Sequence, residues 1–206
     1  MKKLGNLFLI IGMALILFVV YAKVQTYLEQ KKMIEEYTSL NLAANEDDAT
    51  DSEVKRGETI GMVEIDKIGL KTAMVEGAEQ DNIKFAVGHL PFSSSLYELG
   101  KENHNFAIVG HRSYTYGKFF NRLDELENND EIIVYARNKV LTYKVFDKKI
   151  VQPTNVDVVN PIEGKSVVTL ITCYPEYSDA QRLVLFSELV EEKTLDGSEF
   201  AALLKN

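Results

Sequence analysis

The chain has 206 residues, with 31 acidic and 23 basic side chains and a formal net charge of −8. This length has room for one domain with appendages. The acidic balance argues against a nucleic-acid partner, which would need a basic face. The single cysteine excludes an intramolecular disulfide. His89, His104 and His111 lack the HExxH pattern and zinc spacing, so we predict neither a metal site nor a cofactor.

The N-terminus predicts a membrane helix. Lys2 and Lys3 precede an apolar run from Leu4 to Ala22, and about 19 helical residues span a hydrocarbon core of about 30 Å. A cleaved secretory signal is the alternative, but Val20-Tyr21-Ala22 fits a small-x-small cleavage site poorly. We therefore expect residues 1–22 to be an uncleaved, single-pass signal anchor in the cell membrane, with the rest of the chain outside.

The next segment predicts a spacer between the membrane and a domain. Residues 23–42 are rich in Glu, Gln, Lys, Leu and Met and contain neither Pro nor Gly, which suits a continued helix. Residues 45–58 are acidic and poor in apolar side chains, which is typical of a linker. We predict a spacer and linker over residues 23–57, a folded domain over residues 58–192 and a tail over residues 193–206.

The domain consists of short strand patterns bounded by turn residues. Strands are expected at 60–68, 70–75, 106–110, 131–135, 140–146, 166–173 and 183–190. Residues 131–135 and 140–146 suggest a hairpin, and residues 150–159 an irregular crossing. Short helices are expected at 119–126 and 198–204. Eight or so short strands with few helices predict an all-β barrel or sandwich.

The only cysteine ends the most apolar strand. Residues 166–173, SVVTLITC, are mostly β-branched and uncharged, as in a strand buried on both faces. Pro175 cannot extend a central ladder, so the strand must end near the thiol of Cys173. A lone cysteine is often a small buried hydrophobic residue, but a strand end that opens to solvent also suits a nucleophile.

Two further residues could support a thiol nucleophile. His111 follows the strand 106–110 within Gly110-His111-Arg112, and a half-exposed histidine can carry a proton. Arg182 opens the strand after that of Cys173, and a loop over residues 174–181 would return it beside the sulfur. A guanidinium there could stabilise an oxyanion. We expect solvated surface charges at Arg56, Arg122 and Arg137, a structural ion pair at Arg112, and structural hydrogen bonds at His89 and His104.

These motifs resemble those of the sortases. Thr169-Leu170-Ile171-Thr172-Cys173 is similar to the TLxTC signature of that family, with Arg182 nine residues later and Gly110-His111-Arg112 before it. The likeness runs from about residue 58 to 191. It implies a closed eight-stranded sortase-type β-barrel with short helices, behind an N-terminal transmembrane helix, in a Gram-positive bacterium.

The resemblance also implies a reaction. Cys173 would attack an LPxTG-like sorting signal of a surface protein, His111 would act as acid and base, and Arg182 would stabilise the oxyanion and position the peptide. The thioacyl-enzyme would be resolved by an amine, either of a lipid-linked peptidoglycan precursor or of another protein's lysine.

The subclass and other functions stay open. Gly88-His89-Leu90 and the step to Arg182 resemble pilin-polymerising, class C-like sortases, but the polar tail and the lack of an aromatic residue in 45–58 suggest an open, class A-like or class D-like site. An L,D-transpeptidase or papain-like hydrolase also uses Cys and His, although a papain-like cysteine precedes its histidine. A non-catalytic, membrane-tethered β-domain that binds the cell wall is the remaining alternative.

Overall fold

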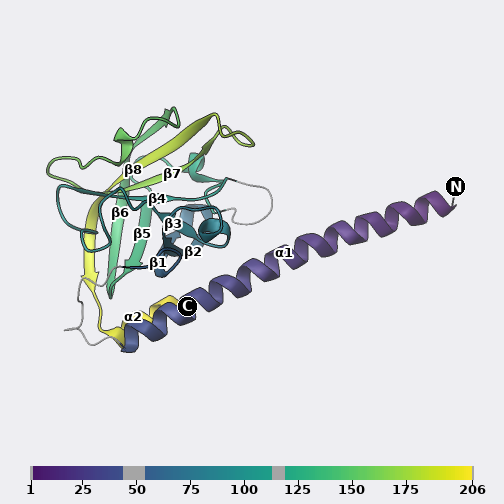
Figure 1. The fold of residues 1–206 in the computed structure, drawn as a ribbon, viewed down its shortest axis with the longest axis horizontal. Helices are drawn as coiled ribbons and strands as arrows, with labels where there is room; N and C mark the ends of the chain where they lie inside the picture. Colours follow the sequence, from purple (N-terminus) through teal and green to yellow (C-terminus); the bar gives the residue numbers. More distant parts are fainter. Residues whose placement is uncertain (1, 44–53, 113–118, 206) are drawn as a thin grey trace.

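The computed structural model describes residues 2–43, 54–112 and 119–205. Eight strands close into a barrel in the order β1-β2-β3-β4-β7-β8-β6-β5, as expected, and one long helix runs beneath it (Figure 1). The strands are β1 (Thr59–Ile65), β2 (Leu70–Glu76), β3 (Val87–His89), β4 (His104–Val109), β5 (Glu131–Ala136), β6 (Lys139–Val151), β7 (Ser166–Tyr174) and β8 (Gln181–Thr194). The helices are α1 (Lys2–Ala43) and α2 (Gly197–Lys205), with 3-10 turns η2 (Asp66–Ile68), η3 (Asn82–Lys84), η4 (Leu123–Glu125) and η5 (Asp157–Val159).

Alternating apolar residues fill the barrel. Side chains on successive strand residues point to opposite faces, so one set from each strand meets inside. Phe106 and Ile108 of β4, Val168 and Leu170 of β7, and Leu185 of β8 are at most 1% exposed and belong to one cluster. This inner cluster is the main hydrophobic core, and it fixes the positions of the strands that carry the candidate site.

The three strands β4, β7 and β8 form one side of the barrel. β4 runs parallel to β7 with a constant register, from His104 opposite Ser166 to Val109 opposite Ile171. β8 runs antiparallel to β7 over residues 181–188 without a bulge. β7 has neighbours on both edges and is buried on both faces up to Thr172, as its composition predicts.

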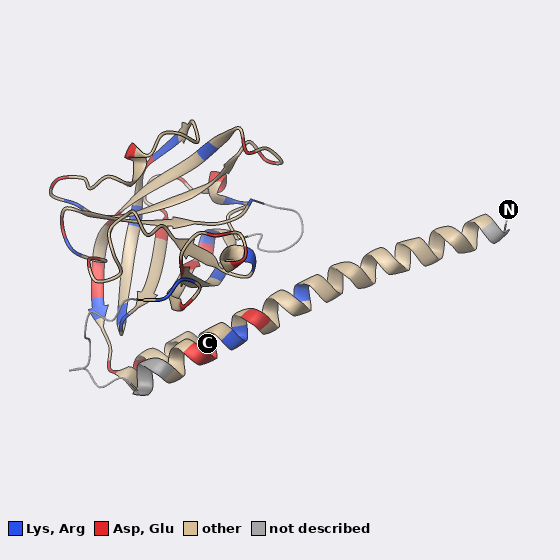
Figure 2. Ribbon diagram, in the orientation of Figure 1, with Lys and Arg blue, Asp and Glu red and all other residues tan. Residues whose placement is uncertain are grey.

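Helix α1 divides into an exposed half and a docked half. Figure 2 shows no charge on α1 between Leu4 and Ala22, and most of those apolar side chains are exposed. α1 is the one helix in the described residues that is long and apolar enough to span a membrane. Later in α1, Gln30 donates hydrogen bonds to Thr72 Oγ1 (3.0 Å) and Phe85 O (3.2 Å), so this half packs against the barrel.

The C-terminal helix packs against the same half of α1. The rings of Tyr37 and Phe200 meet edge to face, 6.4 Å apart. Both side chains join Met62, Leu195 and Leu204 in a second cluster beneath β1. In the barrel order β1 and β2 lie across from β7 and β8, so α1 covers the side opposite the candidate site.

Three local predictions differ from the structure. The helix expected over residues 119–126 contains only the 3-10 turn η4, because Phe120, Leu123 and Leu126 point into the end of the barrel and are wholly buried there. β3 was missed because it has only three residues. The irregular crossing expected at 150–159 begins later, since β6 continues to Val151 against β8. The linker expected at 45–58 lies outside the described residues up to position 53.

Candidate functional site

The strand register places the three predicted residues in one row. Each residue of β4 lies opposite the residue of β7 that is 62 positions later, and this offset carries His111 to the level of Cys173. Gly110 N continues the ladder by donating to Ile171 O at 3.2 Å. Cys173 itself is paired with Arg182 across β7 and β8. Three adjacent strands therefore deliver a histidine, a cysteine and an arginine at the same level.

The same three residues share the outer face of the barrel. Val109, Ile171 and Val184 belong to one apolar cluster outside the barrel core. His111 and Cys173 lie two residues after Val109 and Ile171, and Arg182 lies two residues before Val184. Since alternate residues of a strand share a face, all three side chains extend the row of that cluster. We call the cluster the outer cluster; its buried members are Ala107, Val159, Val167, Ile171, Val184 and Phe186.

Cys173 lies where β7 passes from buried to partly exposed residues. The preceding residues 166–172 are buried, whereas Cys173 is a free, partly exposed cysteine. Thr172, just before it, donates from Oγ1 to Gly110 O at 2.8 Å and is 2% exposed. This bond ties the end of β7 to the residue before His111, so the thiol and the imidazole have fixed backbones.

His111 is partly buried, and burial lowers the pKa of its imidazole from the usual value of 6.5. Its carbonyl accepts a hydrogen bond from Phe120 N (3.3 Å), and the ring of Phe120 lies directly against Gly110. A Cβ at position 110 would come within 2.6 Å of that ring, so only glycine fits here. The neutral imidazole that results at pH 7 can accept a proton.

Arg182 is held at the start of β8 by its own loop. Its Nη1 donates to Asp179 O at 2.8 Å and to Gln181 O at 2.9 Å. Within the described residues the other guanidinium nitrogens make no hydrogen bond. These contacts orient the guanidinium and leave donors that could bind a carbonyl oxygen or an oxyanion.

The outer cluster forms a packed apolar layer, here called the floor, that leads along the strands to the row; its buried members are at most 8% exposed. Its floor comes from β4, β7 and β8, and one wall comes from the connection between β6 and β7, where Val158, Val159 and Ile162 pack against it. The partly exposed thiol of Cys173 lies at the end of this layer, where a substrate can reach it.

Arg112 lies behind the row, on the inner face of the sheet. Its side chain is 5% exposed and pairs with Asp124 at 3.1 Å, which confirms the predicted ion pair. Its guanidinium also lies 5.6 Å from the centre of the Tyr174 ring. Within the described residues, Nε and Nη1 of Arg112 are buried without a hydrogen-bond partner.

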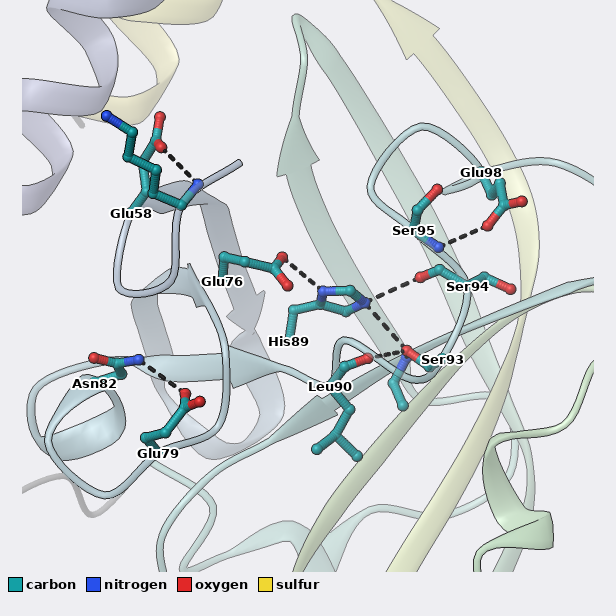
Figure 3. Close-up of polar contacts among 12 residues, drawn as sticks. Glu58, Glu76, Glu79, Asn82, His89, Leu90, Ser93, Ser94, Ser95 and Glu98 are labelled. Atoms are coloured by element: carbon teal, nitrogen blue, oxygen red, sulfur yellow. Dashed lines mark hydrogen bonds and ion pairs between the residues drawn. The ribbon is translucent and has the colours of Figure 1, made fainter. Parts of the chain in front are cut away.

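The two other histidines lie outside the row, in hydrogen-bonded positions. Figure 3 shows His89 between Glu76 and the serine turn: Nδ1 is 2.8 Å from Glu76 Oε2, and Nε2 is 3.1 Å from Ser93 Oγ and 3.0 Å from Ser94 O. The ring also stacks on Phe106 at 4.1 Å. His104 Nδ1 lies 3.3 Å from Ser94 Oγ. Both match the structural role expected for them.

The remaining candidates offer no second site. Arg56 contacts Glu79, Arg122 forms a two-pronged pair with Glu125, and Arg137 lies over the ring of Tyr97. All three are exposed, as expected for solvated surface charges, and each also has a surface partner. Among the described residues no group of three or more His, Cys, Asp or Glu side chains could hold a metal ion.

The sequence did not point to the wall of the floor or to a polar pair of side chains within the floor. Val158, Val159 and Ile162 lie in a connection without periodic pattern. Asn105 and Thr169 are wholly buried on the outer face. One sequence signal could have revealed Asn105. It lies an even number of residues before Val109 and His111 along β4, so its polar amide shares a strand face that is otherwise mostly apolar.

A family model described as the sortase domain matches residues 63–190 of this chain. This range covers the barrel from β1 to β8 and includes the whole row.

Individual sortases are similar over much of the chain. Sortase SrtE1 of Streptomyces coelicolor is 25% identical over 93% of this chain, and the chain spans 58% of that protein's length. A Clostridium perfringens sortase D5 structure aligns with a TM-score of 0.61 and 25% identity over 83% of this chain and 99% of its own. A Clostridium perfringens sortase C structure with the C-terminal cell wall sorting motif has a TM-score of 0.63 and 28% identity, over 79% of this chain and 88% of its own.

Proposed function

The chain belongs to the sortase family of cysteine transpeptidases, and from this premise we propose that it anchors surface proteins to the cell wall. It would cleave an LPxTG-like sorting signal and transfer the protein to an amine of a lipid-linked peptidoglycan precursor. The observation that carries the proposal is the strand register, which sets His111, Cys173 and Arg182 in one row at the end of an apolar floor.

In the proposed first step, Cys173 attacks the carbonyl carbon between Thr and Gly of the sorting signal. The neutral imidazole of His111 accepts the thiol proton as the S–C bond forms. The carbonyl oxygen becomes an oxyanion, and the guanidinium of Arg182 stabilises that charge through the donors its loop leaves available. When the C–N bond breaks, His111 returns the proton to the departing amine.

In the second step an incoming amine attacks the thioester. His111 takes a proton from that amine as the new amide bond forms, and the thiolate of Cys173 leaves and regains a proton. Water in place of the amine would give slow hydrolysis. The partial burial of His111 fits this cycle, because a histidine with a lowered pKa is a neutral base at pH 7.

The relatives support a peptide substrate. The sortase C structure described above contains a cell wall sorting motif, and its fold matches this chain over most of the barrel. We infer that an extended peptide would bind beside the wall at residues 158–162 of this chain, where Val158 and Ile162 are partly buried. The sorting signal and the amine are proposals for this chain, which spans 58% of the length of sortase SrtE1 and 56% of the length of sortase D of Bacillus subtilis.

We also propose that α1 anchors the enzyme in the cell membrane as a single pass. The charge-free run from Leu4 to Ala22 is helical and mostly exposed, and exposed apolar side chains over this length suit a hydrocarbon core. With α1 on the opposite side of the barrel, the row remains accessible to substrates outside the membrane. We favour a class A-like or class D-like enzyme, with class C-like polymerisation of pilins as the alternative.

The direct test is mass spectrometry of the full-length chain in detergent micelles. It would be incubated with LPxTG, LPxTA and related peptides, with and without triglycine or a lysine-containing peptide as the amine. We expect a covalent adduct on Cys173 that the amine resolves. The preferred peptide identifies the sorting signal. Preference for triglycine over the lysine peptide supports wall anchoring rather than pilin polymerisation.

Cys173→Ala is the matched control. It should abolish the adduct and leave the thermal unfolding temperature within a few degrees of wild type, because the thiol lies at the partly exposed end of β7. Turnover retained by Cys173→Ala would contradict the proposal. A folded wild-type chain that forms no adduct but whose thiol alkylates readily would indicate another acyl substrate, and an unreactive thiol would favour a wall-binding domain.

A further inference from the structure

Two buried polar side chains lie within the apolar floor, on the outer face. Asn105 of β4 and Thr169 of β7 are 0% exposed. Both have the parity of His111 and Cys173 along their strands, so they share the outer face. Thr169 Oγ1 donates to Asn105 Oδ1 at 2.7 Å. Burial of polar groups is unfavourable unless they are hydrogen-bonded, so this pair requires an explanation.

The amide of Asn105 binds the wall of the floor. Its Nδ2 donates one hydrogen bond to Val158 O (3.1 Å) and one to Asn160 O (3.0 Å). These two carbonyls flank Val159, the buried residue of η5. Carbonyl oxygens only accept hydrogen bonds, which fixes the amide nitrogen on the side of η5 and the amide oxygen toward Thr169. Both amide hydrogens and the amide oxygen are therefore used.

The backbone of Asn105 is fixed from its other edge. Asn105 N donates to Ser94 Oγ at 2.9 Å, and Ser94 N donates to Asn105 O at 3.0 Å. Ser94 O in turn lies 3.0 Å from Nε2 of His89, whose Nδ1 faces Glu76 (Figure 3). A chain of polar contacts thus runs from the end of β2 to η5, with Asn105 as the point where it reaches the wall.

We propose that Asn105 is a positioning residue that holds residues 158–160 at the height required to bind the sorting signal. This inference rests on the proposed function, because it assigns the wall beside the floor to the peptide. Val158 and Ile162 are only partly buried on this wall, so a peptide that runs beside it to Cys173 would contact their exposed parts. An interaction that shapes the groove acts on substrate and transition state alike, so its loss changes KM more than kcat.

The test compares Asn105→Ala with Ser187→Ala in the full-length chain. Ser187 is also 0% exposed and donates one hydrogen bond, to Val168 O at 2.7 Å, but it has the parity of Leu185 and so faces the inner core rather than the wall. Loss of two hydrogen bonds to the wall should speed amide hydrogen exchange of residues 156–162 by about tenfold or more in Asn105→Ala. Ser187→Ala should leave that segment unchanged.

The kinetic arm uses the peptide that acylates the wild-type chain best. Asn105→Ala should raise the KM for this peptide about tenfold while kcat stays within about twofold and the KM for triglycine is unchanged. Thr169→Val, which leaves the bonds to η5 intact but removes the donor to Asn105, should give a smaller rise in KM. Asn105→Gln, which keeps an amide, should recover part of the wild-type KM.

Equal exchange of residues 156–162 in Asn105→Ala and Ser187→Ala would overturn the proposal. So would a fall in kcat with an unchanged peptide KM. If the wild-type chain reacts with no peptide, the proposed function fails, while the exchange comparison still decides whether Asn105 holds the wall.

Discussion

The inner and outer faces of the sheet β4-β7-β8 carry side chains of the same three strands, but only the outer face leads to the row of candidate site residues. On the inner face, Phe106, Ile108 and Leu170 are enclosed by the other strands of the barrel. On the outer face, Ala107, Val109 and Ile171 belong to a cluster that the η5 segment, Leu90, Phe146 and Val151 cover, and the row of His111, Cys173 and Arg182 lies at the end of this cluster. A shift of one residue along a strand therefore separates a side chain that stabilises the fold from one positioned for chemistry.

The largest loss of stability should come from a substitution on the inner face. Leu170→Ala removes a wholly buried side chain and should lower the free energy of unfolding by about 2–5 kcal/mol. Ile171→Ala, on the outer face, should fall at or below the lower end of that range, because Ile171 is 8% exposed and its neighbours Val109 and Val158 are only partly buried, so the site can relax. Urea unfolding of both variants measures the difference. Equal losses would show that the outer floor is packed as tightly as the core.

At Arg182 we expect a large loss of activity with little loss of stability. Arg182→Ala should lower kcat/KM for the sorting peptide by about 100-fold to 1000-fold, the usual loss for one oxyanion donor, while the unfolding temperature stays near that of wild type. Arg182→Lys keeps the charge but not the planar fork, so it should recover only part of the activity. A large loss of stability in either variant would mean that the arginine is mainly structural.

A smaller effect should come from the side that α1 covers. Arg137 N donates to the hydroxyl of Tyr37 at 3.1 Å, and Tyr37→Phe leaves this amide without that acceptor. We expect a loss of about 0.5–1.5 kcal/mol in unfolding free energy, with kcat and KM unchanged, because the contact lies across the barrel from the row. An altered peptide KM would show that the two sides are coupled.

The smallest effect on stability should come from the protonation of His111. Burial lowers the pKa of His111 from 6.5, so below pH 6.5 the native state binds fewer protons than the unfolded chain. The stability due to neutral His111 is complete above pH 6.5 and is lost as the pH falls toward the native pKa. NMR titration of the imidazole should give a midpoint below 6.5. The same titration in Cys173→Ala shows whether the thiol influences the pKa of His111. A midpoint above 6.5 would contradict the role of His111 as a neutral base at pH 7.

Local sequence pattern was sufficient for much of the fold. The β-branched run of residues 166–173 predicted a strand buried on both faces, and the register confirms its central place in the barrel. The loop over residues 174–181 predicted the pairing of Cys173 with Arg182, which the structure contains. The closed barrel came from the family resemblance, since spacing alone left a sandwich possible.

Other features depend on contacts between distant residues and carry little local signal. Phe120, Leu123 and Leu126 have helical spacing, yet they fill the end of the barrel from a turn. The role of Asn105 depends on Val158 O and Asn160 O, more than 50 positions away. Neither the parallel pairing of β4 with β7 nor the path of the η5 segment can be read from alternation within one strand.

The packing of α1 against α2 bears on how the enzyme can be shortened. Phe200 and Leu204 are at most 3% exposed, and Tyr37 and Ile34 of α1 belong to the cluster that buries them. A soluble form that begins at Glu58 would uncover this apolar surface beneath β1, and such surfaces promote self-association. A form that begins near Tyr27 would keep the covering turns of α1 while removing most of the apolar run, and it should remain monomeric at higher concentration.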